Sequence, residues 1–233
     1  FGGITSFTEL VLDAVEEAKA ATGIGMSVVI AANRTRHPLD ARTLARLATK
    51  FVGRGVHGFG LSNDERRGDS TDFGPAFAIA ERAGLKLVPH GGELRGPAHV
   101  ETVLDHLHPH RLGHGVRAAE DPELLARVVA EGVALEVCPA SNVALGVYPT
   151  IDEVPVRALK KAGAKVALGS DDPLLFGTRL AGQYALLRAA QNFSDEELAD
   201  LARDSIDASY APTEIKTKAH YDIDVWLDSP EDH

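Results

Sequence analysis

Two short strings hold side chains that could perform metal-assisted hydrolysis. His90-Gly91-Gly92-Glu93 follows one apolar run, and Ser170-Asp171-Asp172-Pro173 follows another about eighty residues later. Each string stands where a buried strand is expected to end, so imidazole and carboxylate groups would project from two strand ends. Such groups can bind a metal ion, activate a water molecule and move protons.

The first string combines a candidate metal ligand with a candidate acid. His90 directly follows its apolar run, so it is expected at the rim of the sheet. The carboxylic acid of Glu93 could protonate a substrate nitrogen if burial keeps its proton on near neutral pH. The same string also fits a hydrogen-bonded histidine and an ordinary glutamate at a helix start.

A second histidine ends the next expected strand. His114 is flanked by Gly113 and Gly115, which leave its imidazole room to approach a reacting water molecule. It is a candidate general base, or a group that orients a hydroxide ion. A histidine with a structural role, or one that is merely exposed, is the alternative.

The twin aspartates suit two separate tasks. Adjacent side chains at a strand end point in different directions, so one of Asp171 and Asp172 could bind a metal ion and the other a substrate. The alternative is that Asp172 caps a helix whose first residue is Pro173.

Other polar strings favour structural roles. Cys138-Pro139-Ala140-Ser141-Asn142 follows a strand, but the P-C-x-x-C string of cytidine-type deaminases is absent from the sequence, which has a single cysteine. Cys138 is therefore expected to be a packing residue, with Ser141 and Asn142 shaping the loop. His106 and His108 resemble a metal-binding pair, but they stand at an expected helix end and are predicted to lie on the surface.

A regular alternation of strands and helices must position these residues. Apolar runs predict strands at residues 26–32, 56–61, 85–89, 111–114, 133–137 and 165–168. Helical periodicity predicts helices at residues 6–21, 39–52, 71–83, 98–107, 122–131, 154–162 and 180–191, and Ser194-Asp195-Glu196-Glu197 predicts the capped start of another. Strands that are apolar throughout are typical of a parallel sheet covered by helices.

Chemistry at the ends of several strands favours a (β/α)8 barrel over an open doubly wound sheet. The sequence has no Walker-type loop, and no G-x-G-x-x-G string stands between an expected strand and the helix after it, where an open nucleotide-binding sheet would need one. Six β/α units predict an α/β fold that is a partial barrel over residues 1–210, without its N-terminal units, followed by a C-terminal tail at 211–233.

Composition excludes several classes of partner. The chain has 233 residues, 44% of them hydrophobic, and a net charge of −10. This charge argues against nucleic acid or an anionic membrane as partner and favours a small molecule. A single cysteine favours a reducing compartment, so the cytoplasm is expected. The sequence has no apolar stretch of the roughly twenty residues that cross a bilayer, and a start at Phe1 suggests a trimmed chain.

Four strings in this order resemble the adenosine deaminase family of the amidohydrolase superfamily. They are H-[AG]-G-E at His90, G-H-G at Gly113, C-P-x-S-N at Cys138 and [ST]-D-D-P at Ser170. The resemblance implies a hydrolase that releases ammonia from a 6-aminopurine, with His90 and Asp171 as ligands of a catalytic Zn²⁺. It also implies that Glu93 protonates N1 of the purine, that His114 orients or deprotonates the attacking water, that Asp172 contacts N7, and that Gly92 lies at the substrate.

Two departures from the family pattern limit the transfer. The family's H-x-H pair has no counterpart, so two expected histidine ligands are predicted to lie outside this chain, on a strand before Phe1. The family's D-L-A-G-D-E stands here as Gly60-Leu61-Ser62-Asn63-Asp64-Glu65, so the Asn63 side chain could narrow the purine pocket. The residues in the H-G-G-E and L-S-N-D-E strings also resemble those of actinobacterial members, some of which resemble aminodeoxyfutalosine deaminases of menaquinone biosynthesis.

Three hypotheses follow. The first is a zinc-dependent deaminase of adenosine or a related compound, with adenine and aminodeoxyfutalosine as alternative substrates. The second keeps the amidohydrolase barrel but changes the substrate to another amino-heterocycle. The third is a metal-free partial barrel that serves as a binding or interaction subunit. The oligomeric state is left open, with a homo-oligomer as one possibility.

Overall fold

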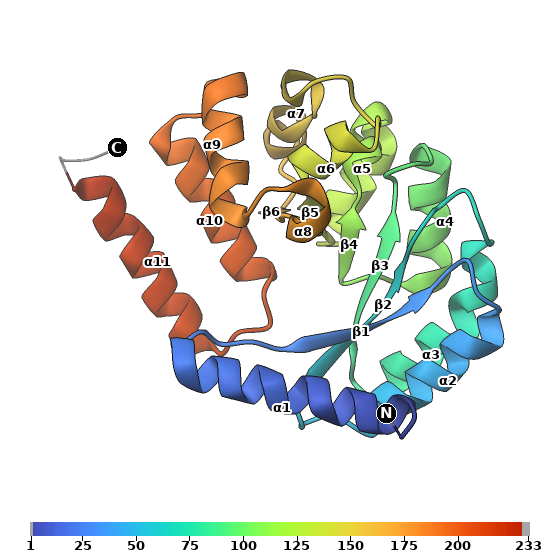
Figure 1. Cartoon of the computed structure of the whole chain (residues 1–233). Helices are drawn as coiled ribbons and strands as arrows, with labels where there is room; N and C mark the ends of the chain where they lie inside the picture. The colour runs from blue at the N-terminus through green and yellow to red at the C-terminus, as the bar shows by residue number, and fades with distance from the viewer. Residues whose placement is uncertain (1, 230–233) are drawn as a thin grey trace. The chain divides into compact units, whose positions relative to one another are not determined.

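The computed structural model describes residues 2–229 (Figure 1). The chain divides into two compact units, the first formed by Phe1–His90 and Thr102–His110, the second by Gly91–Glu101 and Arg111–His233. In the described residues, no helix has both the length and the apolar character needed to span a membrane.

The first unit contains three parallel strands and the helices that follow them. β1 pairs with β2, and β2 pairs with β3, with Val29 opposite Gly58 and Phe59 opposite Leu87. The elements are α1 (Ile4–Thr22), β1 (Val28–Asn33), α2 (Pro38–Thr49), β2 (Val56–Ser62), the 3-10 helix η1 (Ser70–Phe73), α3 (Gly74–Arg82) and β3 (Lys86–Gly91), and α4 (Pro97–Leu107) ends in this unit.

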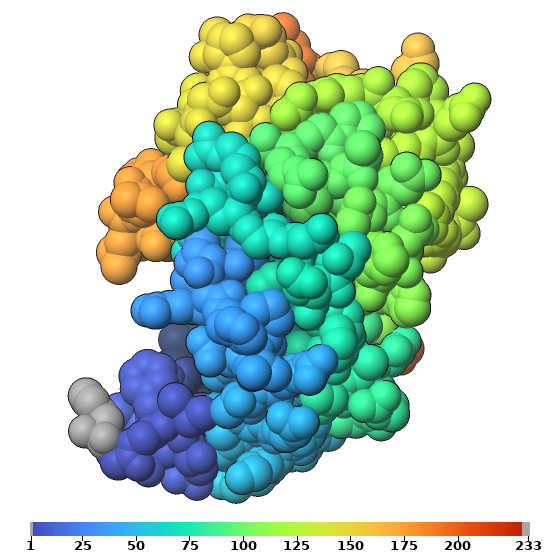
Figure 2. Space-filling view, turned by 90° about the vertical axis from the view of Figure 1, so that its right-hand side faces the viewer, coloured from blue at the N-terminus to red at the C-terminus, as the bar shows by residue number. Residues whose placement is uncertain are grey.

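Aromatic packing holds this unit together. Phe59 on β2 and Phe77 on α3 are fully buried, and their rings meet edge to face with centroids 5.2 Å apart. α2 and α3 pack against each other, and Figure 2 shows the surface of α2 in blue beside that of α3 in turquoise. Arg34 is also buried and donates hydrogen bonds to the Ser70 hydroxyl (3.1 Å) and to the His90 carbonyl oxygen (2.8 Å). This guanidinium fixes the end of β3 within the first unit.

The second unit holds three more parallel strands. β4 pairs with β5 and β5 with β6, so that Leu112 lies opposite Leu135 and Leu135 opposite Val166. The elements are β4 (Arg111–His114), η2 (Val116–Glu120), α5 (Pro122–Ala130), β5 (Ala134–Val137), α6 (Pro139–Ala144), η3 (Ile151–Glu153), α7 (Val156–Lys161), β6 (Val166–Leu168), α8 (Pro173–Phe176), α9 (Leu180–Gln191), α10 (Asp195–Ala208) and α11 (Thr213–Asp228).

Side chains of α10 bind the backbone of β6. The N–H of Val166 donates to Asp204 Oδ2 (2.9 Å), and the N–H of Leu168 donates to the Ser205 hydroxyl (3.3 Å). Asp204 also pairs with Lys160 at the end of α7. These contacts fasten β6, the strand that leads to Asp171, to the helix outside it.

The predicted strands and helices are all present, most of them with shifted ends, while β4 and α9 have the predicted ends. The helix expected at residues 71–83 is divided into η1 and α3, and Pro75 lies in the first turn of α3, where a proline is favoured. The capping box at Ser194 and Glu197 is confirmed, and so is the exposure of His106 and His108. The sequence did not predict α6 or α11, and α11 occupies most of the segment expected to be a tail.

Candidate active site

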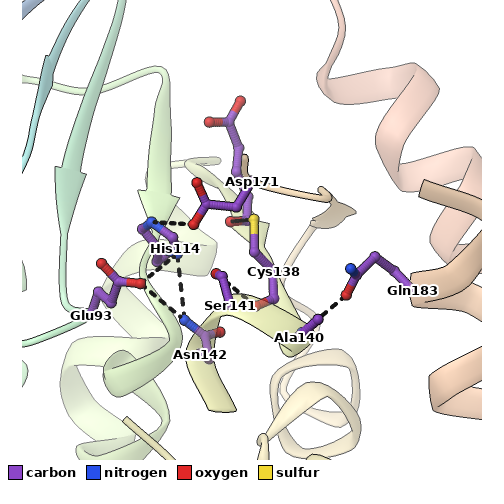
Figure 3. Close-up of polar contacts among 9 residues, drawn as sticks. Glu93, His114, Cys138, Ala140, Ser141, Asn142, Asp171 and Gln183 are labelled. Carbon is purple, nitrogen blue, oxygen red and sulfur yellow. Dashed lines mark hydrogen bonds and ion pairs between the residues drawn. The ribbon is translucent and has the colours of Figure 1, made fainter. Parts of the chain in front are cut away.

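His114 is the centre of a buried polar cluster in the second unit. It ends β4 and is only 3% exposed. Its Nδ1 lies 3.3 Å from Glu93 Oε1, and its Nε2 lies 4.0 Å from Asp171 Oδ2 (Figure 3). Glu93, His114 and Asp171, which the sequence places at or just after the ends of three different strands, therefore lie close together.

A glycine turn delivers Glu93 to this cluster. Gly92 has φ +76°, and a Cβ there would come within 2.3 Å of Val100 Cγ2, so only glycine fits. The turn buries Glu93, which is 6% exposed, and α4 does not begin until Pro97. The alternative interpretation of Glu93 as an ordinary helix-start residue is therefore wrong.

Two members of the cluster have left-handed backbones. His114 has φ +64° and Asp171 has φ +57°, a conformation that is uncommon outside glycine. Such strain persists where surrounding structure enforces it, and it concentrates at functional sites. Gly115 follows His114 with φ +67°, and a Cβ there would meet Leu135 Cδ2 at 2.5 Å. The backbone is therefore held tightly where the imidazole enters the cluster.

Asn142 belongs to the same cluster, although the sequence was interpreted as giving it only a loop-shaping role. Its Nδ2 donates to Glu93 Oε1 (3.3 Å) and lies 3.5 Å from His114 Nδ1. The side chain is fully buried, and among the described residues its Oδ1 has no hydrogen-bond partner. Its place in the C-P-A-S-N string was the one signal that could have identified it.

A short helix, α6, carries Asn142 into the cluster. Pro139 occupies the first turn of α6, where its missing N–H and fixed φ favour helix initiation. The Ser141 hydroxyl donates to the Cys138 carbonyl oxygen (3.1 Å), which confirms that Ser141 shapes this segment. What was expected to be a loop is therefore a helical turn with two buried polar residues.

His114, Cys138 and Asp171 form a candidate metal centre. One donor atom from each lies within 4.8 Å of the other two. Imidazole nitrogen, thiolate sulfur and carboxylate oxygen are the three donor types that Zn²⁺ accepts, so the donor set fits this ion. The sequence assigned Cys138 to packing alone. It is buried as expected, but it also lies beside two potential ligands.

The Cys138 thiol is held in its protonated form by its surroundings. Burial raises its pKa strongly, and the negative charge of Asp171 raises it further. A protonated thiol is a poor nucleophile and a poor ligand, whereas a nearby cation would favour the thiolate. Burial and the nearby carboxylates therefore disfavour the thiolate of Cys138.

Asp172 serves as the N-cap of α8. Its Oδ1 accepts hydrogen bonds from the N–H groups of Leu174 and Leu175, both at 3.0 Å. The capping interpretation of Asp172 is confirmed. A contact of this residue with a substrate stays a prediction, for which Oδ2 is the atom outside the cap.

Two predicted site residues, His90 and Asn63, lie in the first unit. His90 is at the end of β3, where Arg34 binds its carbonyl oxygen. Its predicted pairing with Asp171 on one metal ion stays a prediction. Asn63 is exposed after β2 with φ +82°, and its Oδ1 accepts from the N–H of Asp64 (2.9 Å). The left-handed conformation at Asn63 is the one that a glycine would adopt readily.

Comparison with known proteins shows which family the chain resembles. The sequence model of the family described as adenosine deaminase matches residues 3–226. The "Putative adenosine/adenine deaminase" of Streptomyces virginiae is 58% identical over 97% of this chain and 67% of its own length. The "Adenine deaminase" of Rhizobium leguminosarum bv. trifolii is 39% identical over 92% of this chain and 66% of its own length.

A solved structure confirms the fold class. The crystal structure of adenine deaminase from Arthrobacter aurescens matches with a TM-score of 0.88 and 28% identity, over 94% of this chain and 67% of that chain. This structural match, together with the six parallel strands of the chain, confirms the predicted α/β class and the predicted partial (β/α)8 barrel. The chain spans about two thirds of the length of these relatives.

Proposed function

The chain belongs to the adenosine deaminase family, a family of hydrolytic deaminases, and we propose on that premise that it removes the amino group of a 6-aminopurine as ammonia. The single observation that carries the proposal is the buried contact of Glu93 with His114, which also lies beside Asp171. An acid and a base within one enclosed site are what hydrolysis of a C–N bond requires.

The proposed roles follow from the positions of the side chains. Glu93 donates its proton to a ring nitrogen of the purine, which makes C6 more electrophilic. The oxygen of a water molecule bonds to C6 while His114 orients this water and accepts its proton. The C6–N bond then breaks as the amino group gains the proton held by His114 and leaves as ammonia. The C6 hydroxyl loses its proton to the Glu93 carboxylate and becomes the carbonyl, which restores both side chains.

We propose Zn²⁺ as the metal, supported by the Asp171 carboxylate of the candidate metal centre, which is also one of the ligands that the sequence predicts. When bound, a zinc ion would supply a water molecule of lowered pKa and a positive charge near the reacting atoms. Asp171 and His90 are the proposed ligands from this chain. Two further histidine ligands are predicted outside it.

Adenosine or an adenosine-like compound is the proposed substrate, and adenine is the second candidate. Adenine is favoured by relatives such as the Rhizobium protein, which is named for that activity. Asp172 Oδ2, the backbone of Gly92 and Asn63 are the groups proposed to contact the purine. Exposed Asn63 is proposed to influence which compound is preferred, including aminodeoxyfutalosine.

Ammonia release from adenosine, adenine and aminodeoxyfutalosine tests the proposal. We expect the natural polypeptide that carries this chain to deaminate at least one of them. Absence of release from every 6-aminopurine would overturn the proposed function. We also expect Asn63→Gly to change the order of preference among the three compounds, and an unchanged order would remove Asn63 from the substrate site.

We propose a cytoplasmic location for this enzyme, supported by its single cysteine. The proposed partner is the small purine substrate, and the net charge of −10 argues against nucleic acid and anionic membranes. Association into a homo-oligomer stays a prediction that sedimentation analysis would test.

A further inference from the structure

The start of α6 lacks a local cap. Its N-cap residue, Cys138, makes no side-chain capping hydrogen bond, and Pro139 has no N–H to offer. The N–H of Ala140 lies in the first turn, where no intrahelical acceptor is available. A buried N–H without an acceptor would destabilise this turn.

Gln183 supplies the missing acceptor from another helix. It lies near the start of α9, and its Oε1 accepts a hydrogen bond from the Ala140 N–H at 3.1 Å (Figure 3). The two residues are 43 positions apart in the sequence. α6 is thus capped in space by the side chain of Gln183.

Among the residues that the structure describes, the other end of the Gln183 amide is unpaired. The side chain is fully buried, and within the described part of the chain its Nε2 has no hydrogen-bond partner. Burying an unpaired amide nitrogen offsets much of what the hydrogen bond through Oε1 contributes. A purely stabilising role therefore explains this glutamine poorly.

The position of α6 determines where the Asn142 amide lies. Asn142 follows Ala140 by two residues, and its Nδ2 is 3.3 Å from Glu93 and 3.5 Å from His114. Both distances are near the upper limit for a hydrogen bond, so a shift of a few tenths of an ångström would break them. We propose that Gln183 is a positioning residue that holds α6 so that Asn142 bridges Glu93 and His114.

The catalytic test compares two glutamines on the same helix. Gln183→Met removes the acceptor while keeping a side chain of similar length. The matched control is Gln191→Met, because the Nε2 of Gln191 also binds backbone, at the Ile151 (2.6 Å) and Val154 (2.8 Å) carbonyl oxygens. Gln191 contacts neither α6 nor the polar cluster in these hydrogen bonds.

This test rests on the proposed function. We expect Gln183→Met to lower kcat for ammonia release about tenfold or more, with KM changed less than about threefold, because the side chain acts on positioning. Gln183→Glu, which keeps an acceptor oxygen, should recover most of the loss. Gln191→Met should lower the melting temperature while kcat stays within about twofold. Equal loss of kcat in both methionine variants would overturn the proposal.

Hydrogen exchange provides a second test of the role of Gln183, and this test needs no substrate. In the 233-residue chain, Gln183→Met should accelerate exchange at the Ala140 amide by about tenfold, because its acceptor is lost. Exchange there should be unchanged in Gln191→Met. Unchanged exchange in Gln183→Met would overturn the proposal even if the enzyme is active. If no 6-aminopurine is deaminated, the proposed function fails, and exchange at Ala140 still decides whether Gln183 holds α6.

Discussion

Glu93 and His114 face each other across 3.3 Å inside the second unit, with both side chains less than a tenth exposed. Asn142 lies against both of them and donates to the carboxylate. An acid, an imidazole and an amide donor thus share one small enclosure, and each can be changed separately.

Glu93→Gln should abolish most of the activity while the fold is kept. The amide matches the carboxyl group in size but cannot donate an acidic proton, so kcat for deamination should fall about 10²- to 10⁴-fold. Steady-state ammonia release and the melting temperature measure the two effects. Glu101→Gln, on the exposed side of α4, is the control and should keep full activity. A Glu93→Gln enzyme with more than a tenth of the original kcat would remove Glu93 from the role of acid.

Asn142→Asp tests whether activity depends on the hydrogen-bond donor of the Asn142 amide or only on the shape of its side chain. The substitution keeps the shape but places a second carboxylate 3.3 Å from the Glu93 oxygen, where the Nδ2 donor stood. Repulsion and the lost hydrogen bond should lower kcat about 10- to 100-fold. Asn142→Ser, which restores a small donor, should be less impaired. Kinetics of both variants check this, and equal activity in Asn142→Asp and the parent would contradict it.

Gly115→Ala should be strongly destabilising, whereas Gly132→Ala should not. Both glycines have left-handed backbones, with φ +67° and φ +69°, but a Cβ at 115 would meet Leu135 Cδ2 at 2.5 Å and a Cβ at 132 meets nothing within 4 Å. The backbone penalty of about 1 kcal/mol is common to both, and the clash adds about 1–3 kcal/mol at Gly115. Urea unfolding measures the difference, and equal losses would show that the clash relaxes freely.

Asp171→Asn should weaken metal binding, and Asp172→Asn should not. The Asp171 carboxylate lies with His114 and Cys138 in the candidate metal centre, while Asp172 Oδ1 caps α8. Losing one charged ligand should raise the dissociation constant for Zn²⁺ about tenfold or more. Competition with a chelating dye measures the affinity of each variant. Equal weakening by both substitutions would mean that the segment moves as a whole and that Asp171 is not a ligand.

Glu197 should make stability depend on pH below neutrality. The side-chain hydrogen bond from Arg157, and then the N–H of Ser194, lower its pKa from 4.5. Because the folded pKa is below the unfolded one, the stabilisation is present above about pH 4.5 and is lost as pH falls through the folded pKa. Both side chains are more than a third exposed, so Glu197→Gln should lower the free energy of unfolding at pH 7 by only about 0.5 kcal/mol.

Denaturant unfolding at pH 7 and pH 3 checks the prediction for Glu197. The loss caused by Glu197→Gln should be smaller at the lower pH, because protonation of the carboxyl group removes its interaction with Arg157. Glu214→Gln, in the first turn of α11, is the control for a helix-start glutamate outside this pair. A loss that is the same at both pH values would show that the charge on Glu197 is not responsible.

The strands could be predicted because apolar runs ended by glycine or polar residues leave few alternatives. Helices α6 and α11 escaped prediction for different reasons. α6 has six residues, too few for a helical period to show, and α11 keeps much of its surface exposed, so its apolar pattern is weak. Helix α11 is also held by ion pairs to α10, from Arg203 to Asp224 and from His220 to Asp207.

The site was predicted in part because chemistry at strand ends follows from the order of the elements. Glu93, His114 and Asp171 meet as that order suggests. The contact between Asn142 and Glu93 spans 49 positions and depends on α6, which local patterns did not reveal. The left-handed backbones of His114 and Asp171 could not be predicted either, because this conformation is uncommon in any residue other than glycine, even in the types that adopt it most.

The hydrogen bonds from β6 to α10 have a consequence for association. A strand with vacant N–H groups is a template on which a strand of another molecule can add, which is the usual route to edge-to-edge aggregation. At Val166 and Leu168 these donors are already engaged by Asp204 and Ser205. An incoming strand would have to displace a carboxylate and a hydroxyl before it gained a hydrogen bond, so α10 protects this short strand from recruiting a neighbour.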